Sequence, residues 1–154
     1  MLFACKYCTG LIFSPTLLHT KHANKSSKKI LNKINTKLYK SILKEKDLDE
    51  LIKHLNEKTI IAVDTETTSL NPQEASLVGI SISYAANTSY YIPLSHKNIK
   101  GLDKEIVLKK LKIILEDASI KKVGQNIKYD FIIFKNNGIT LNPVDDTMLL
   151  SYTL

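Results

Sequence analysis

Apolar and polar residues follow a regular pattern from about residue 39 onward. Four apolar residues recur at the spacing of one helix face and predict a helix over 47–56: Leu48, Leu51, Ile52 and Leu55. Asp47 stands where it would cap the first turn of that helix. A second amphipathic stretch predicts a helix over 103–117. Two shorter helices are predicted, one over 129–135 that stops at Asn137 and Gly138, and one that begins at Asp146.

Short runs rich in β-branched residues predict strands between these helices. The predicted strands cover 39–43, 59–65, 77–84, 89–92 and 121–123. Residues 85–88 form a connection of hairpin length between the third and the fourth strand. Antiparallel hairpins followed by strand–helix–strand alternation predict an α/β fold, with a mixed sheet flanked by helices.

Composition agrees with one globular domain. The chain has 154 residues, of which 44% are hydrophobic and 24% charged, and its two cysteines are too few for a disulfide scaffold. No apolar run approaches the length of a membrane span, and the apolar N-terminal stretch lacks the charged start and the cleavage pattern of a secretion signal. We therefore expect a soluble, cytoplasmic protein without a membrane partner.

The net charge of +7 is unevenly distributed. Residues 1–46 hold ten lysines and one acidic residue, a net charge of +9, whereas residues 47–154 have a net charge of −2. Residues 1–38 are poor in apolar residues beyond the first stretch and predict a basic, flexible arm ahead of a domain over 39–154. Such an arm attracts nucleic acid by releasing counterions, or it is simply a solvated leader; the sequence leaves both open.

Two acidic residues stand at the end of the strand predicted over 59–65. Asp64 and Glu66 are two residues apart, so in a strand both carboxylates point to the same side. Such a pair repels itself unless a cation lies between the two groups, and hard cations such as Mg²⁺ prefer oxygen ligands. The alternative is a pair of exposed acids at a strand boundary.

A second polar cluster follows the strand predicted over 121–123. Gln125 and Asn126 lie at the turn, and Asp130 lies one helical turn after Asn126 on the same face. Asp130 could therefore join Asp64 and Glu66 around a metal. The alternative is a surface aspartate that pairs with Lys128.

Read together, five segments resemble the 3′–5′ proofreading exonuclease domain of bacterial family A DNA polymerases. They are VDTETTSL (63–70), LVGISISY (77–84), YYIPLSH (90–96), KKVGQNIKYD (121–130) and DTMLLSY (146–152). Their order and spacing match that domain over 39–154. The resemblance implies an RNase H-like exonuclease fold, magnesium- or manganese-dependent hydrolysis by two metals, and single-stranded DNA 3′ ends as substrate. It also makes a downstream polymerase segment a possible partner.

The resemblance further implies roles for individual residues. Asp64 is similar to the acid that bridges both metals, Glu66 to its partner on the first metal, and Asp130 to the acid that serves the second. Leu70 occupies the position of an apolar wedge between the last bases of the bound strand. Four further residues fall on positions that contact the 3′ end: Gln125, Asn126, Lys128 and Tyr129.

One part of the family pattern is missing from this sequence. The family places a fourth acid in a Y-x-x-x-D motif, whose tyrosine orients the attacking water, and no such motif occurs here. We therefore expect a C-terminally incomplete domain whose first metal lacks one ligand and whose activity is impaired. Asp146 matches a helix start rather than a metal ligand, and Asp145 is an equally weak substitute.

Three alternatives to an active DNA exonuclease follow from the sequence. They are a module that binds single-stranded nucleic acid without cleaving it, a decayed polymerase gene fragment, and an RNase D-like exonuclease acting on RNA. The arm adds one separate pattern: Cys5, Cys8, His19 and His22. These residue types bind structural zinc, but the spacing departs from a zinc finger, which favours reduced thiols and unligated imidazoles.

Overall fold

The computed structural model describes residues 38–94 and 100–153. The basic arm predicted over 1–38 lies outside the described residues except for Leu38, and so do Cys5, Cys8, His19 and His22. In chain order the elements are β1 (Leu38–Ser41), α1 (Glu45–Asn56), β2 (Ile60–Thr67), β3 (Leu77–Ser83), β4 (Thr88–Pro93), α2 (Lys104–Leu115), β5 (Lys121–Gly124), α3 (Ile127–Asn136), β6 (Val144–Asp146) and α4 (Thr147–Tyr152).

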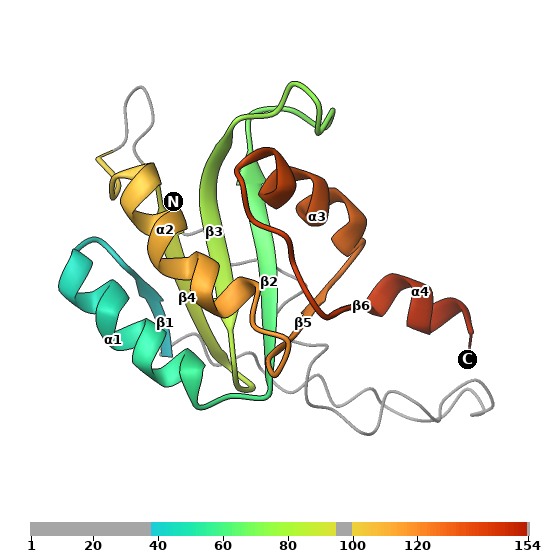
Figure 1. Ribbon diagram of the computed structural model, residues 1–154, viewed down its shortest axis with the longest axis horizontal. Coiled ribbons are helices and arrows are strands. Elements are labelled where there is room, and N and C mark those ends of the chain that lie inside the picture. Colours follow the sequence, from blue (N-terminus) through green and yellow to red (C-terminus); the bar gives the residue numbers. More distant parts are fainter. Residues whose placement is uncertain (1–37, 95–99, 154) are drawn as a thin grey trace, which may run out of the picture.

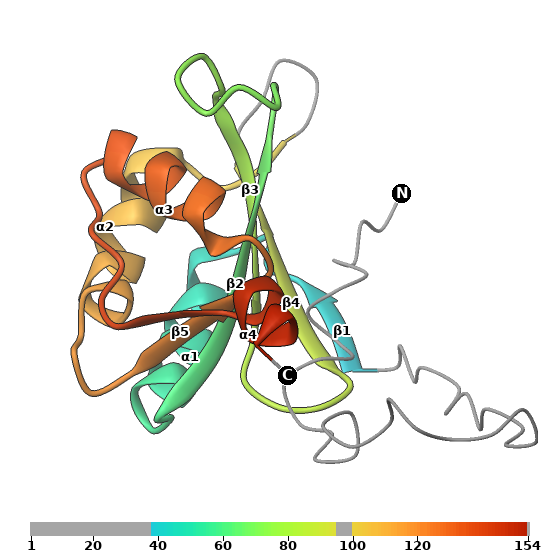
Figure 2. The same cartoon turned by 90° about the vertical axis from the view of Figure 1, so that its right-hand side faces the viewer.

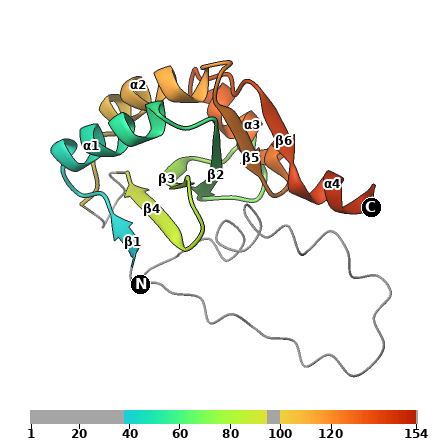
Figure 3. The same cartoon turned by 90° about the horizontal axis from the view of Figure 1, so that it is seen from below.

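The strands of the described chain form one mixed sheet in the order β1-β4-β3-β2-β5-β6 (Figure 1). β3 is antiparallel to both of its neighbours, β2 and β4, while β1 pairs with β4, β5 with β2, and β6 with β5 in parallel. Figures 2 and 3 show α1, α2 and α3 together on one face of the sheet, whereas α4 extends away beyond β6. The predicted α/β fold with a mixed sheet flanked by helices is confirmed.

The hydrophobic core fills the space between the three helices and the sheet. Alternate residues of the central strands point toward the helices, as the period of two requires. The fully buried side chains include Ile61, Val63, Ile80, Ile82, Leu51, Leu111 and Phe134. Each side chain of this size contributes about 1.5–3 kcal/mol when it is removed from water, so this layer holds β2 in place as the rigid base of the site.

Of the four helix starts predicted from the sequence, those at Asp103 and Asp146 agree with the structure. Asp103 caps α2 by accepting a hydrogen bond from the amide of Ile106, and Asp146 caps α4 by accepting one from Met148. The prediction that Asp47 caps the first helix is wrong, because α1 begins at Glu45 and its N-cap is Lys44, which makes no side-chain capping bond. Asp47 lies inside the first turn instead, where a negative charge still interacts favourably with the helix dipole.

Two features of the C-terminal part were not predicted. β6 is a strand of three residues, too short to leave a pattern in the sequence. Beside it, the fully buried Lys122 of β5 donates hydrogen bonds to the backbone carbonyls of Ile114, Asp117, Ile120 and Asn142. Burial lowers the pKa of Lys122 to about 8, and the charge of Asp117 opposes this. The ammonium therefore ties the end of α2 to β5 and to the segment that leads into β6.

Within residues 38–94 and 100–153, no helix combines the length and the apolar character needed to cross a bilayer.

Candidate functional site

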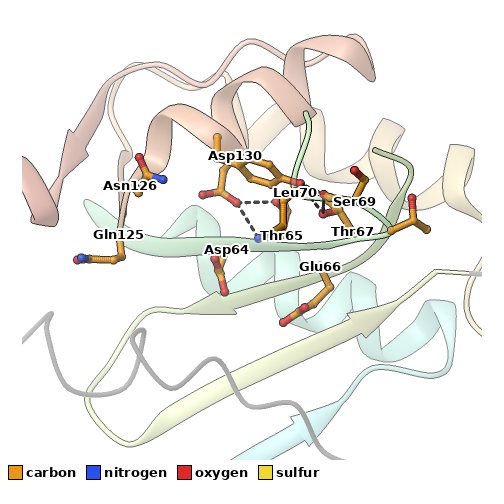
Figure 4. A pocket seen from close by; sticks show the side chains of 11 residues that line it. Asp64, Thr65, Glu66, Thr67, Ser69, Leu70, Gln125, Asn126 and Asp130 are labelled. Atoms are coloured by element: carbon orange, nitrogen blue, oxygen red, sulfur yellow. Dashed lines mark hydrogen bonds between the residues drawn. The ribbon is translucent and has the colours of Figure 1, made fainter. Parts of the chain in front are cut away.

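The candidate site lies at the C-terminal end of β2, beside the start of α3 (Figure 4). Eleven residues line a pocket of about 600 Å³: Asp64, Thr65, Glu66, Thr67, Thr68, Ser69, Leu70, Gln125, Asn126, Tyr129 and Asp130. Seven of the eight site residues predicted from the sequence are in this set. The eighth, Lys128, is exposed and does not line the pocket. Segments some sixty residues apart in sequence therefore meet here because β5 pairs in parallel with β2 and delivers α3 to its end.

Asp130 is a buried residue whose partner is β2. Its side chain is 3% exposed, and its Oδ1 accepts hydrogen bonds from the backbone amide of Thr65 at 2.8 Å and from the Thr65 hydroxyl at 2.5 Å. Burial raises the pKa of the Asp130 carboxyl to about 7; the Thr65 bonds oppose this and the charge of Asp64 adds to it. The alternative of a surface aspartate paired with Lys128 is wrong, because α3 turns this face inward.

Asp64 and Glu66 occupy the other side of β2, as Figure 4 shows. Both are half-buried, and within the described residues neither carboxylate receives a hydrogen bond or an ion pair. Burial and then the charge of Asp64 raise the pKa of Glu66. A divalent cation would relieve this repulsion, and two carboxylates from one strand face suit a hard ion such as Mg²⁺ or Mn²⁺.

The three predicted metal ligands share the pocket but do not form one cluster. Thr65 separates them, because it points toward α3 and binds Asp130 while its neighbours point away. In the part of the chain that the structure describes, no group of three acidic, histidine or cysteine side chains is arranged to hold a metal. The donor set therefore fits one cation on Asp64 and Glu66, with Asp130 near enough to feel the charge of Asp64.

The loop that carries Leu70 is held against α3 by hydroxyl groups. The Tyr129 hydroxyl donates to the backbone carbonyl of Ser69 at 2.5 Å and lies 2.5 Å from the Thr67 hydroxyl. Asn136 of α3 donates to the carbonyl of Pro72 at 3.0 Å. Leu70 is 96% exposed on this loop, at the edge of the pocket that it helps to line. Thr67 and Ser69 were not predicted, since nothing local marks them.

The start of α3 is tied to the start of α4. Asn126 adopts a left-handed backbone with φ 56°, which asparagine tolerates better than most residues, and its amide donates to Asp146 Oδ1 at 3.0 Å. Gln125 accepts a hydrogen bond from the Thr147 hydroxyl at 2.6 Å. Asp146 thus acts as a helix cap, as predicted, and Asp145 pairs with Lys121 at 2.8 Å. Neither aspartate lines the pocket.

Comparison with known sequences connects this geometry with a family. The model of the 3′–5′ exonuclease domain of type A DNA polymerases matches residues 39–154. DNA polymerase I of Rhizobium leguminosarum is 42% identical to this chain, in an alignment that covers 70% of the chain and 12% of that protein. The chain thus spans a small part of the curated relative that it matches.

Comparison with solved structures supports the fold. Escherichia coli RNase D, described as an exoribonuclease involved in structured RNA processing, superimposes with a TM-score of 0.58 at 25% identity over 73% of this chain and 28% of that one. Brucella melitensis NrnC with bound Mg²⁺ gives a TM-score of 0.52 at 24% identity over 75% of this chain and 51% of that one. The predicted RNase H-like exonuclease fold is confirmed.

Proposed function

This chain belongs to the family of 3′–5′ exonuclease domains of type A DNA polymerases, and on that premise we propose that it hydrolyses single-stranded DNA from the 3′ end. The observation that carries the proposal is the pocket at the end of β2. It combines an unpaired carboxylate couple, Asp64 and Glu66, with an exposed apolar side chain, Leu70, on a fixed loop. The carboxylate couple could hold the cation that hydrolysis of a phosphodiester uses, and the apolar side chain could contact an unpaired base.

Strand binding is assigned to the side chains along the pocket. Leu70 offers an apolar surface to the last bases, and the Tyr129 hydroxyl holds the loop that carries it. Gln125 and Asn126 supply amide groups on the opposite wall, and Lys128 supplies a charge outside the pocket for the phosphate backbone. Recognition by apolar contact and stacking is tolerant of base sequence, as an exonuclease that removes successive nucleotides requires.

Hydrolysis is assigned to the three carboxylates. Asp64 and Glu66 would hold Mg²⁺ or Mn²⁺. Because Thr65 occupies Oδ1 of Asp130, Asp130 would serve a second ion together with Asp64 only through its other oxygen. When bound, such a pair of ions lowers the pKa of an attacking water and stabilises the leaving 3′ oxygen. The protein contributes the rigid base of β2, the placement of Asp64 and Glu66 on one face of that strand, and the Thr65 hydrogen bonds that hold Asp130.

Cleavage by this chain alone is expected to be slow. The sequence holds no Y-x-x-x-D motif, so a fourth carboxylate and a water-orienting tyrosine are missing from the set that the family uses. Groups that act only in the transition state change kcat more than binding, and a single such group contributes about 10²–10³ in rate. A downstream polymerase segment that supplies this motif is the partner we propose.

The test is a labelled single-stranded DNA oligonucleotide with a free 3′ end. It is incubated with Mg²⁺ or Mn²⁺ and the chain, its Asp64→Ala variant, or the chain plus a separately supplied segment with the Y-x-x-x-D motif. We expect stepwise shortening barely above background for the chain alone, a clear gain with the segment, and neither in Asp64→Ala. Shortening that persists unchanged in Asp64→Ala would contradict the assignment, and an RNA oligonucleotide of the same sequence tests the RNase D-like alternative.

A second candidate function is single-strand binding without cleavage. It is favoured by the position of Asp130, whose carboxylate is occupied by Thr65 on the far side of β2 from the carboxylate pair. In this case the chain retains the labelled DNA equally well with and without Mg²⁺, and no added segment produces shortening.

The basic arm is proposed to provide much of the affinity for DNA. Residues 1–46 carry a net charge of +9 and residues 47–154 a net charge of −2. Seven of the ten lysines in residues 1–46 lie in the arm over 1–38, so counterion release depends largely on the arm. A chain that starts at Tyr39 is expected to bind single-stranded DNA at least about tenfold more weakly at low salt, with a smaller salt dependence. Equal affinity of the two chains would assign binding to the pocket alone.

A further inference from the structure

Gly79 in β3 is covered by the phenol of Tyr91 from β4. A Cβ atom built on Gly79 would lie 2.4 Å from the Tyr91 hydroxyl oxygen and 2.6 Å from its ring carbon Cε2. Real Cβ atoms do not come so close to another side chain, so only glycine leaves room for this ring. Because Gly79 has no side chain, the end of the Tyr91 ring can lie over it, and we call this position the seat of Tyr91. The residue directly opposite Tyr91 in the strand pair is Ser81, two residues further along β3.

The strand register places this seat beside the carboxylate pair. Glu66 is directly opposite Gly79, and Asp64 is directly opposite Ser81. Residues opposite each other in antiparallel strands share a face of the sheet, so Tyr91 lies on the face of Asp64 and Glu66, away from α3. Its hydroxyl therefore fills the position next to Glu66 that a larger residue at position 79 would occupy.

A polar group without a partner lies on the same face of the sheet. The Ser81 hydroxyl is buried, with 1% of the residue exposed, and it has no hydrogen-bond partner within the described residues. It stands between Asp64 and Tyr91 in the sheet.

We propose that Tyr91 is a positioning residue for the carboxylate pair: its hydroxyl, seated on Gly79, restrains the Glu66 carboxylate so that it binds a divalent cation together with Asp64. The inference rests on the proposed function, since it concerns the same cation site. Glu66 receives no hydrogen bond within the described residues, so we propose this contact for the cation-bound site. There, a phenol that donates to one carboxylate oxygen leaves the other free for the metal and limits the rotation of the side chain. Hydrogen bonds of this kind to a metal-binding carboxylate typically change metal affinity by about 10–100-fold.

The first test is calorimetric titration of the full chain with Mn²⁺, without nucleic acid. Tyr91→Phe keeps the ring on Gly79 and removes only the hydroxyl, and we expect Mn²⁺ to bind about tenfold more weakly. Tyr90→Phe is the matched control, because it makes the same change at the next residue and loses the hydrogen bond to the Tyr84 hydroxyl. We expect Tyr90→Phe to leave Mn²⁺ affinity unchanged, whatever it does to the unfolding midpoint.

A second variant moves the hydroxyl without removing it. Gly79→Ala forces the Tyr91 ring off its seat, so it should weaken Mn²⁺ binding as Tyr91→Phe does. Both changes act through one hydroxyl, so their effects should not add. The double variant should bind Mn²⁺ about as tightly as whichever single variant has the lower affinity. Additive losses would overturn the proposal, as would Tyr91→Phe binding Mn²⁺ as tightly as the parent.

Asp64→Ala in the same titration separates this inference from the proposed function. If the parent and Asp64→Ala bind Mn²⁺ equally, the cation site itself is wrong, and the role of Tyr91 falls with it. If binding depends on Asp64 but Tyr91→Phe equals Tyr90→Phe, the cation site stands and only the positioning role is overturned.

Discussion

The two sides of β2 hold acidic side chains in opposite ways. On the side of α3, Asp130 is buried and accepts two hydrogen bonds from Thr65. On the other side, Asp64 and Glu66 are half-buried and receive no hydrogen bond within the described residues. The first arrangement uses the carboxylate to join a helix to the sheet. The second leaves two carboxylates with their repulsion uncompensated.

This difference separates the polar groups that stabilise the fold from those that remain available to bind a ligand. Thr67 and Tyr129 repeat the first arrangement, because their hydroxyl groups bind each other and the Ser69 carbonyl. Tyr91 and Ser81 lie on the second side, where the Tyr91 hydroxyl covers Gly79 and the Ser81 hydroxyl has no hydrogen-bond partner within the described residues. Substitutions on the two sides of β2 should therefore affect folding and cation binding to different extents.

The largest expected effect is on cation binding. Asp64→Ala should abolish Mn²⁺ binding, because it removes one of the two carboxylates on the open side, whereas Asp130→Ala should only weaken it. Titration of each variant with Mn²⁺ gives the comparison, and Asp145→Ala serves as the control because its carboxylate pairs with Lys121 outside the pocket. Complete loss in Asp130→Ala with full binding in Asp64→Ala would reverse the assignment of the two sides.

The next effect is on stability. Asp130→Ala leaves the buried amide and hydroxyl of Thr65 without their acceptor, and it should lower the free energy of unfolding by about 2 kcal/mol. Asp130→Asn keeps an oxygen that can accept both hydrogen bonds and should cost much less. Urea denaturation measures both variants. Asp49→Ala is a suitable surface control, since Asp49 is exposed and pairs with Lys110. Equal losses in Asp130→Ala and Asp130→Asn would show that the charge, not the acceptor, matters.

A further effect is a dependence of stability on pH. The pKa of Asp130 is about 7 in the folded protein, against an ordinary value of 3.8, so between these values the folded state binds more protons than the unfolded state. This contribution to stability is fully present below pH 4 and is lost as the pH rises through 7. The free energy of unfolding of the parent, compared with that of Asp130→Asn, should therefore fall over this range. Parallel curves for the two proteins, measured by denaturation with a chelator present, would contradict it.

The smallest expected effect is the change in stability when the Asp64–Glu66 side of β2 is altered without metal. Glu66→Gln removes one of two repelling charges, so with a chelator it should stabilise the fold by about 0.5 kcal/mol. With Mn²⁺ in excess the sign should reverse, because the parent gains binding free energy that the amide variant does not. Thermal unfolding of the parent and of Glu66→Gln, measured once with the chelator and once with Mn²⁺, gives both changes in stability. A destabilising Glu66→Gln in chelator would mean that Glu66 has a structural partner.

Much of the fold follows from local patterns. Short runs rich in β-branched residues marked β2, β3 and β4, and helical spacing marked α1 and α2, because burial selects these residue types and this spacing in the sequence. Asp146 was identifiable as a cap, since capping needs only a nearby amide, whereas Asp103 was expected only as the first residue of its helix. Asp47 was misassigned because Lys44 and the acidic residues that follow it allow the helix to start earlier.

The site was identifiable in part for the same reason. Asp64 and Glu66 share a face because a strand has a period of two, and this needs no knowledge of the rest of the molecule. That Asp130 lies near them followed from the family resemblance and the turn after β5. Its burial and its bonds to Thr65 could not be predicted, since they depend on the side of β2 against which α3 packs.

The sequence by itself determined the order of the elements, the carboxylate pair at the end of β2 and the uneven charge between the arm and the domain, because each of these is a property of neighbouring residues. Only the tertiary structure decided which groups pair. Thr65 binds Asp130 across 65 positions, Lys122 reaches the end of α2, and Tyr91 covers Gly79 on the adjacent strand. These contacts depend on strand register and on the packing of helices against the sheet, and both are set by the burial of the whole core rather than by any single segment.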